Sequence, residues 1–363
     1  MSNSGENLEP TEPNQHGEAG EATGTPADAP PRGRAHRIGR WVLIGMGIVL
    51  AVALLAMLIP VSSSNLDARP ESTGSYDDAV ARFDAIVDAE DDLDLFEPCR
   101  SELLDHGERT ARTVVLFHGL TNCPEQFDEF ADEVYDTGAN VLVLRAPHHG
   151  LANAKGDGVG GVGKVGSLSA QELRDFADDA VDIGVGLGDE VDVLGLSMGG
   201  VLALWTGEFR NDVDRVVAVA PAVSIPRVPH FLTTAFVNVG NRLPNFSLSS
   251  PGVKLDHAYA GESTGALAAM FLLARAVGNE VPGSTAAARE VTVVLNPDDN
   301  QVDNGEVKDL VGRWSDADGA IDVVEFPTAG LPHDVIDPGQ PAADVDTVYP
   351  ILLELLAGDE PAS

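Results

Sequence analysis

The stretch VDVLGLSMGGVLALW (191–205) places a serine between an apolar run and a second run with helical spacing. The first six residues are mostly aliphatic, as in a parallel strand that is covered on both faces. The residues after Ser197 contain no proline and predict a helix. A sharp turn between strand and helix needs small neighbours, which the sequence supplies as Gly195, Gly199 and Gly200. The stretch therefore predicts a nucleophile elbow with Ser197 at its tip.

Five other apolar runs lie along the chain, with helical patterns between most of them. Alternation of strands and helices is typical of a mostly parallel sheet with helices on both faces, and we expect this α/β fold. Ligands bind beyond the carboxyl ends of the strands in such a sheet, so chemistry is expected directly after each run. The six predicted strands are 113–117, 140–147, 191–196, 215–223, 291–296 and 321–326.

Two of these strands are followed by residues suited to activate Ser197. The fifth strand leads into PDDNQVDN, where we choose Asp299 as the carboxylate that orients a histidine, with Asp298 as the second candidate. The last strand leads into PTAGLPHDVIDP, where His333 is placed to take the serine proton and return it to the leaving group. The chain order of serine, aspartate and histidine, each after its own strand, supports these choices.

The loop after the first strand, HGLTNCPEQF (118–127), supplies the oxyanion hole in this prediction. The turn at its start leaves the Leu120 N–H free to point at a substrate oxygen, and the Met198 N–H lies at the amino end of the helix after Ser197. We interpret His118 as a structural residue that orders the turn.

No metal or organic cofactor is expected from the sequence. His148 and His149 are adjacent and lack a third, spaced ligand of the kind that a zinc site needs. The glycine-rich segment 155–166 lacks the Gly-Lys-Ser/Thr ending of a phosphate-binding loop, so we interpret it as a flexible connection.

Taken together, these motifs resemble the α/β-hydrolase superfamily over about residues 97–357. The resemblance is to carboxylesterases, monoglyceride-lipase-like enzymes and serine-aminopeptidase-like hydrolases, and it is carried by VVLFHGLTNCPEQF, VLVLRAPHHGLA, VDVLGLSMGG, LNPDDNQVDN and LPHDVID. The chain departs from the family pattern at Asn296, where a glycine is usual, and before residue 113, where few strand signals occur. The resemblance implies a nucleophile, acid and base at Ser197, Asp299 and His333, and oxyanion donors at Leu120 and Met198.

The chain before residue 77 predicts a membrane anchor. Residues 1–40 predict a disordered cytoplasmic tail that ends in several arginines, and the uncharged apolar run 41–61 is long enough to cross a bilayer. The arginines predict that the catalytic domain, 77–363, lies outside the cytoplasm, after a linker at 62–76. A cleaved signal peptide is the alternative, although its apolar core is shorter, at about 7 to 15 residues.

Length and charge limit the functions of this chain. Its 363 residues, 44% of them hydrophobic, are enough for one catalytic domain with appendages. The formal net charge is −36, from 58 acidic and 22 basic residues. A surface this acidic repels a phosphate backbone, so we do not expect nucleic acid as a partner.

The two cysteines, Cys99 and Cys123, follow the predicted anchor and therefore lie on the oxidising side of the membrane in this prediction. A disulfide between them would tie LFEPCRSELL to the loop after the first strand. Two free buried thiols are the alternative.

Residues 224–290, between the fourth and fifth strands, are longer than a simple crossover needs. HFLTTAFVNVG and GALAAMFLLARAV are apolar and compatible with helices, which predicts a small cap over the active site and favours hydrophobic ester substrates. For Ala266 to Val277, a place in the ordinary core is the preferred interpretation.

The sequence as a whole predicts a membrane-anchored serine hydrolase that cleaves carboxylic esters, including acylglycerols, through an acyl-enzyme. A peptidase or amidase of the same fold is one alternative, for which Glu262 is a candidate to bind a free amine. An inactive hydrolase fold that serves as an interaction module is the other alternative, although such a module has no need of a complete triad.

Overall fold

The computed structural model describes residues 32–226, 230–249, 255–280, 285–314 and 321–358. The chain separates into two units, residues 1–54 and 55–363. The first unit holds most of helix α1 (Arg32–Leu58), and the second holds the sheets and the other helices. Over the described residues, no helix combines the length and hydropathy that a membrane span needs.

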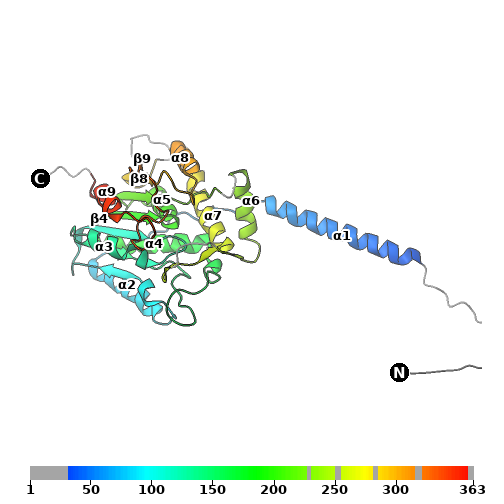
Figure 1. The fold of residues 1–363 in the computed structure, drawn as a ribbon, viewed down its shortest axis with the longest axis horizontal. Helices are drawn as coiled ribbons and strands as arrows, with labels where there is room; N and C mark the ends of the chain where they lie inside the picture. The colour runs from blue at the N-terminus through cyan, green and yellow to red at the C-terminus, as the bar shows by residue number, and fades with distance from the viewer. Residues whose placement is uncertain (1–31, 227–229, 250–254, 281–284, 315–320, 359–363) are drawn as a thin grey trace, which may run out of the picture. The chain divides into compact units, whose positions relative to one another are not determined.

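A seven-stranded sheet forms the centre of the second unit (Figure 1). Its strand order is β1-β3-β2-β4-β5-β8-β9, and β1 is antiparallel to β3 while the other neighbours in this sheet are parallel. Six strands match the six predicted runs, so the predicted α/β architecture is confirmed. The strands are β1 (Glu102–Leu104), β2 (Thr110–Phe117), β3 (Asn140–Val143), β4 (Gly188–Leu196), β5 (Arg215–Val219), β8 (Glu290–Leu295) and β9 (Ile321–Glu325).

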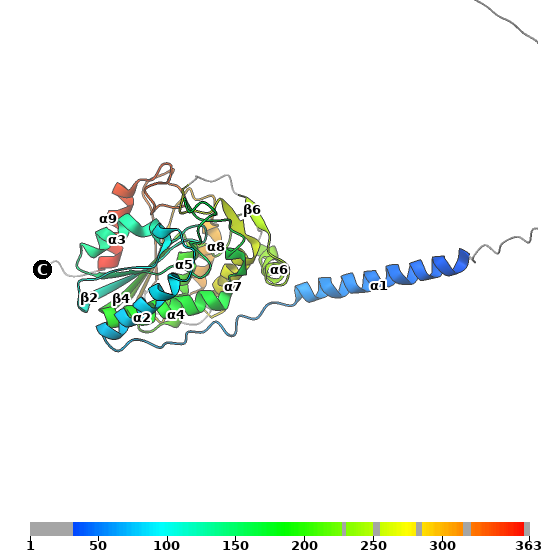
Figure 2. The same ribbon diagram turned by 90° about the horizontal axis from the view of Figure 1, so that it is seen from below.

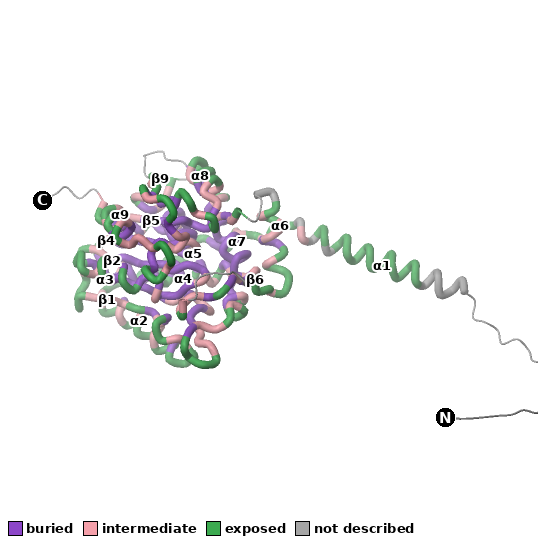
Figure 3. Tube along the Cα trace, in the orientation of Figure 1, coloured by how far each residue is buried: buried purple, intermediate pink, exposed green. Residues whose placement is uncertain are grey.

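Helices cover both faces of this sheet (Figure 2). Val115 and Phe117 of β2 pack into a core with α2, α4, α5 and α7, whereas Val114 and Leu116 pack into a second core with α3 and α9. Figure 3 shows the central strands mostly as buried, whereas the edge strands β1 and β9 are intermediate or exposed. The helices are α2 (Tyr76–Glu90), α3 (Asp128–Tyr135), α4 (Ala170–Leu187), α5 (Met198–Phe209), α7 (Thr264–Glu280), α8 (Asn304–Arg313) and α9 (Val345–Ala357).

The strand register brings the carboxyl ends of the central strands to one edge. Phe117 of β2 lies beside Gly195 of β4, and Leu196 lies beside Val219 of β5. The loops after β2, β4, β5 and β8 therefore meet, as expected for ligand binding in an open parallel sheet.

The region predicted as a cap, residues 224–290, contains α6 (His230–Gly240), two short antiparallel strands and α7. The strands, β6 (Ser247–Ser249) and β7 (Gly261–Ser263), were not predicted. Helix α7 is buried along most of the stretch from Ala266 to Val277, which agrees with the preferred place of that stretch in the core.

The segment predicted as a linker is packed against the domain, and we call residues 62–75 the amino-terminal strap. Leu66 is fully buried, and Trp205 Nε1 of α5 donates a 2.7 Å hydrogen bond to its carbonyl oxygen. Further along, the Glu71 N–H donates to the Asp182 carboxylate of α4 at 2.9 Å. Figure 2 shows the strap running beside α4. The packed part of the domain therefore begins upstream of residue 77.

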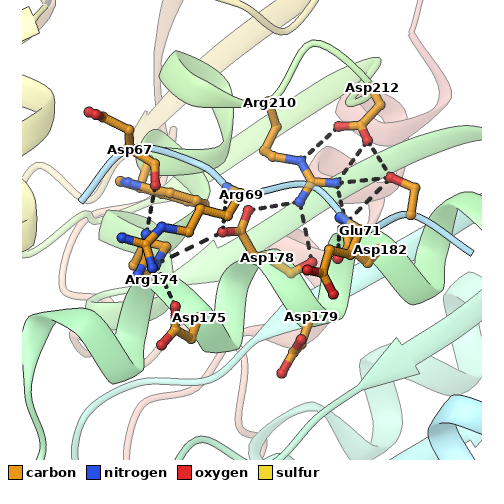
Figure 4. A network of polar contacts seen from close by, with 12 residues as sticks. Asp67, Arg69, Glu71, Arg174, Asp175, Asp178, Asp179, Asp182, Arg210 and Asp212 are labelled. Atoms are coloured by element: carbon orange, nitrogen blue, oxygen red, sulfur yellow. Dashed lines mark hydrogen bonds and ion pairs between the residues drawn. The ribbon is translucent and has the colours of Figure 1, made fainter. Parts of the chain in front are cut away.

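A buried arginine lies under the strap (Figure 4). Arg210 is fully buried, and its guanidinium contacts Asp178 at 2.8 Å, Asp182 at 2.7 Å and Asp212 at 2.8 Å. Ser72 of the strap donates to the Asp212 carboxylate at 2.9 Å. Burial alone would lower the pKa of Arg210, but the carboxylates raise it, so the guanidinium stays charged.

Cys99 and Cys123 form a disulfide with a Cα–Cα distance of 5.2 Å, as predicted. The bond joins two short 3₁₀ turns, η1 (Glu97–Cys99) and the start of η2 (Pro124–Phe127). It therefore fixes the loop after β2 to the segment that precedes β1.

Replacing both cysteines with serine is expected to lower the free energy of unfolding by about 3 kcal/mol. The cross-link closes a loop with a sequence separation of 24, and its loss returns that chain entropy to the unfolded state. Urea unfolding of the double variant measures the effect, with fully reduced wild type as the control. Equal midpoints for oxidised and reduced wild type would contradict the expectation.

Candidate active site

Ser197 lies in the predicted sharp turn between β4 and α5. Its φ of 60° and ψ of −110° are rare for a residue with a side chain, and its N–H donates to the Val219 carbonyl at 3.0 Å. A side chain at Gly195 would overlap the Gly199 backbone, and a side chain at Gly199 would overlap the Phe117 carbonyl. The glycines are therefore required by space, and the turn projects the serine at the carboxyl edge of the sheet.

His333 and Asp299 come from different loops and meet at this edge. His333 Nδ1 lies 2.6 Å from Asp299 Oδ2. Burial would raise the pKa of Asp299, but the hydrogen bond and charge of His333, with the N–H groups of Gln301 and Val302, hold it below its usual value. The aspartate is therefore ionised. Because it occupies His333 Nδ1, the other ring nitrogen, Nε2, is available to accept a proton.

The loop that carries Asp299 is tied to the loop that carries the histidine. Asn296 Nδ2 donates to the carbonyls of Leu331 and Pro332 at 3.1 and 2.9 Å. Asp298 accepts a hydrogen bond from the Gly330 N–H at 2.8 Å and does not contact the imidazole. The asparagine found where the family has glycine thus has a positioning role that the sequence analysis missed.

The loop after β2 is held by His118. This residue is 1% exposed; its Nε2 accepts from the Ala146 N–H at 3.0 Å, and its Nδ1 lies 2.9 Å from the Gly119 carbonyl. Burial lowers the pKa of His118 well below its usual value, so the ring is neutral and structural, as interpreted from the sequence. Among the described residues, the Leu120 N–H has no hydrogen-bond acceptor.

The second predicted oxyanion donor, the Met198 N–H, belongs to the first residue of α5. Backbone N–H groups of the first helical turn have no acceptor within the helix, and the helix dipole favours negative charge there. Leu120 and Ser197 line the same pocket, and Met198 directly follows the serine in the chain.

Asp334, next to His333, links two loops of the candidate site, and the sequence analysis did not single it out. Its carboxylate accepts hydrogen bonds from Gln126 Nε2 at 2.7 Å and Asn122 Nδ2 at 3.2 Å. Burial raises the pKa of Asp334 despite these bonds. The contacts connect the loop after β2, and with it the disulfide, to the histidine loop.

The pocket around Ser197 is small, about 50 Å³, and its walls are polar and apolar in about equal parts. It is bounded on the cap side by Ile225, Met270 and Glu262, the last from β7. The pocket lining also includes Gly119, Leu120, Thr121, Gln126, Leu196, Ala222, Gln301, Val302, His333 and Asp334.

The two adjacent histidines have separate partners. His149 is buried, and burial lowers its pKa to about 4, so the ring is neutral. Its Nδ1 and Nε2 lie 2.9 Å from the carbonyl oxygens of Pro147 and Leu120, and its single N–H donates to one of the two. His148 Nε2 lies 2.9 Å from the Glu172 carboxylate. Within the described parts of the chain, no three residues with metal-binding side chains are grouped.

The chain was compared with known proteins. Residues 108–269 match the family model described as serine aminopeptidase, S33. A thermostable monoacylglycerol lipase from Bacillus sp. (strain H-257) is 27% identical over 166 residues, which cover 42% of this chain and 58% of that enzyme.

Solved structures show the same fold. A monoacylglycerol lipase from Paleococcus ferrophilus matches with a TM-score of 0.54 and 19% identity, over 71% of this chain and 98% of its own. A soluble variant of monoglyceride lipase from Saccharomyces cerevisiae matches with a TM-score of 0.51 and 14% identity, over 69% of this chain and 89% of its own. The chain thus has an α/β-hydrolase fold, and it is similar at low identity to a monoacylglycerol lipase, of which it spans a little more than half the length.

Proposed function

We propose that the protein is a serine esterase that hydrolyses small carboxylic esters, with monoacylglycerols as the preferred class. The observation that carries the proposal is the contact of His333 with Asp299 at 2.6 Å, in the same pocket as a serine held at positive φ. A histidine oriented by an ionised aspartate is the base that a serine nucleophile requires.

The reaction follows from this arrangement. His333 Nε2 takes the Ser197 hydroxyl proton as Oγ adds to the ester carbonyl, and the Leu120 and Met198 N–H groups bind the oxyanion. Asp299 stabilises the imidazolium, which then donates its proton to the leaving alcohol. Water, deprotonated by the same histidine, attacks the acyl-enzyme and releases the acid.

The polar part of the pocket wall suits an alcohol that carries hydroxyl groups. Glu262, Gln301 and Thr121 line the pocket beside Ser197, and their oxygen and nitrogen atoms can hydrogen-bond the hydroxyls of glycerol. The lipase relative acts on monoacylglycerols by its name, which agrees with this choice.

The second candidate function is an aminopeptidase. It is favoured by Glu262, whose carboxylate is suited to a substrate ammonium group, and by the match to the serine aminopeptidase family. The test compares kcat/KM for 1-monoacylglycerols, p-nitrophenyl esters and aminoacyl p-nitroanilides. Turnover of the glycerol esters at least tenfold above the anilides supports the esterase, and the reverse order supports the peptidase.

Replacing Glu262 with glutamine is expected to raise KM for a monoacylglycerol about three- to tenfold with little change in kcat. The substitution weakens a contact made equally in the ground state and transition state, and hydrogen bonds to charged groups are worth about 1.5–3 kcal/mol. p-Nitrophenyl acetate, which lacks the hydroxyls, is expected to show no change. Glu280→Gln, on an exposed residue at the end of α7, is the matched control. A larger loss on aminoacyl substrates than on glycerol esters would contradict the esterase assignment.

Membrane attachment with an extracytoplasmic catalytic domain is also part of the proposal. It is supported by the uncharged run 41–61 after several arginines, and by exposed apolar side chains of α6 and the following segment, such as Leu232 and Phe246 at 44% and 61% exposure. Alkaline extraction of membranes from cells that express the full chain tests it, with protease access from outside as the topology readout. Full release at high pH would argue against an anchor.

A further inference from the structure

A second cavity lies between α6, α7 and α8, separate from the catalytic pocket. Its volume is about 240 Å³, and it shares no lining residue with the pocket of Ser197. Val223 and Ser224 line this cavity, whereas their neighbours Ala222 and Ile225 line the catalytic pocket, so the loop after β5 separates the two. The apolar part of the wall consists of Val223, Val237, Phe271, Ala274 and Leu310.

Two side chains of the cavity lining carry polar atoms without a hydrogen-bond partner. Arg275 Nη1 and Thr233 Oγ1 are both buried and have no hydrogen-bond partner. The other guanidinium nitrogen of Arg275, Nη2, donates to the Val61 carbonyl beside the strap. Buried polar groups are nearly always paired, so two unpaired donors among the lining residues of one cavity are candidates to hold a polar group there.

The charge of Arg275 is also uncompensated. Over the described residues, no carboxylate lies within 4.0 Å of its guanidinium, although Arg145, Arg174 and Arg210 each have such a partner. Burial lowers the pKa of Arg275. Glu306 also lines the cavity and has an interaction of its own. Arg275 is thus a partly buried cation that, over the described residues, has no carboxylate partner and can pair with an anion.

We propose that this cavity binds the carboxylate of a medium-chain fatty acid. Arg275 and Thr233 each offer a donor to the head group, which matches the two oxygens of a carboxylate, and the apolar wall receives the alkyl chain. The exposed Arg313 lies at the edge of the cavity near Gly278 and adds attraction for an anion. The site does not depend on the proposed esterase activity, because none of these residues lines the catalytic pocket.

The test is calorimetric titration of the full chain carrying Ser197→Ala with decanoate, decanol and decyl phosphate. Decanoate is expected to bind one to one and at least tenfold more tightly than decanol. Adding Arg275→Met is expected to weaken decanoate binding at least tenfold. Arg242→Met is the matched control, because Arg242 also donates to a nearby carbonyl, that of Ile59, but does not line the cavity, and it is expected to change binding less than twofold.

Arg313→Ala is a second test, and because this side chain is exposed, its replacement is not expected to disturb folding. A two- to threefold loss of affinity for decanoate is expected. Equal effects of Arg275→Met and Arg242→Met, or equal binding of decanoate and decanol, would overturn the proposal. Tighter binding of decyl phosphate would overturn the carboxylate assignment in favour of a phosphate head group. Turnover of p-nitrophenyl acetate is measured separately with Arg275→Met in a chain that keeps Ser197. Loss of esterase activity and loss of decanoate binding are therefore separate results.

Discussion

Replacing Ser197 with alanine is expected to lower kcat for ester hydrolysis by about 10⁴- to 10⁶-fold and to abolish labelling by a fluorophosphonate probe. The hydroxyl is the attacking atom in the proposed mechanism, and the members of such a triad act as a unit, so its removal leaves only the oxyanion donors and binding. The measurement is initial rates on p-nitrophenyl esters with active-site labelling of the same preparations.

A matched control is Ser224→Ala, five residues beyond the end of β5 and outside the catalytic pocket, which is expected to keep full labelling. Circular dichroism and thermal unfolding confirm that both variants fold. Loss of less than tenfold in a folded Ser197→Ala variant would assign the reaction to another nucleophile. A folded wild type that neither labels nor turns over esters would favour the interaction module.

The elbow could be predicted from the sequence because the need for small residues there concerns positions close to Ser197 in the chain. The three glycines around Ser197 are needed by contacts with Phe117, Gly199 and Pro221, and the turn has a spacing that can be read directly from the sequence. The strands were also predictable, since central parallel strands are continuous apolar runs.

The choice between Asp298 and Asp299 needed the structure. Both are in one loop and both bridge to the histidine loop, but Asp298 contacts the Gly330 N–H and Asp299 contacts the imidazole. The two side chains differ in direction, which depends on backbone angles that composition and periodicity do not encode. The same holds for Asn296, whose role depends on two carbonyls 35 and 36 residues away.

The strap was predicted as a linker for a related reason. Its contacts join backbone groups to side chains far along the chain, such as the Arg69 N–H to Asp178, which are 109 residues apart. Its sequence is polar and irregular, with serine, proline and glycine, and such composition is typical of loops. In the folded chain, the Asp178 and Asp182 carboxylates of α4 and the Trp205 indole of α5 form hydrogen bonds with the backbone of the strap. These partners depend on how α4 and α5 pack, which the local sequence of the strap does not encode.

Replacing Arg210 with methionine is expected to lower the free energy of unfolding by about 3–5 kcal/mol. The guanidinium is fully buried and is the nearest counterion of Asp178, Asp182 and Asp212. Its loss leaves the two buried carboxylates with only the more distant Arg174, at 3.9 Å from Asp178, and Arg82, at 3.5 Å from Asp182. Arg289→Met is the control: that side chain is 65% exposed, and a surface ion pair contributes about 0–1 kcal/mol.

Urea unfolding of a fragment that starts at residue 60 measures both variants. If uncompensated charge is the cause, adding Asp178→Asn and Asp182→Asn to Arg210→Met restores part of the stability, since replacing a whole buried ion group costs much less than breaking it. A fragment that starts at residue 77 lacks the strap and exposes the Trp205 indole and both carboxylates, so we expect it to be less stable than the longer fragment. Equal stability of the two fragments, with Arg210→Met no worse than Arg289→Met, would show that the strap and the arginine beneath it are not part of the folded unit.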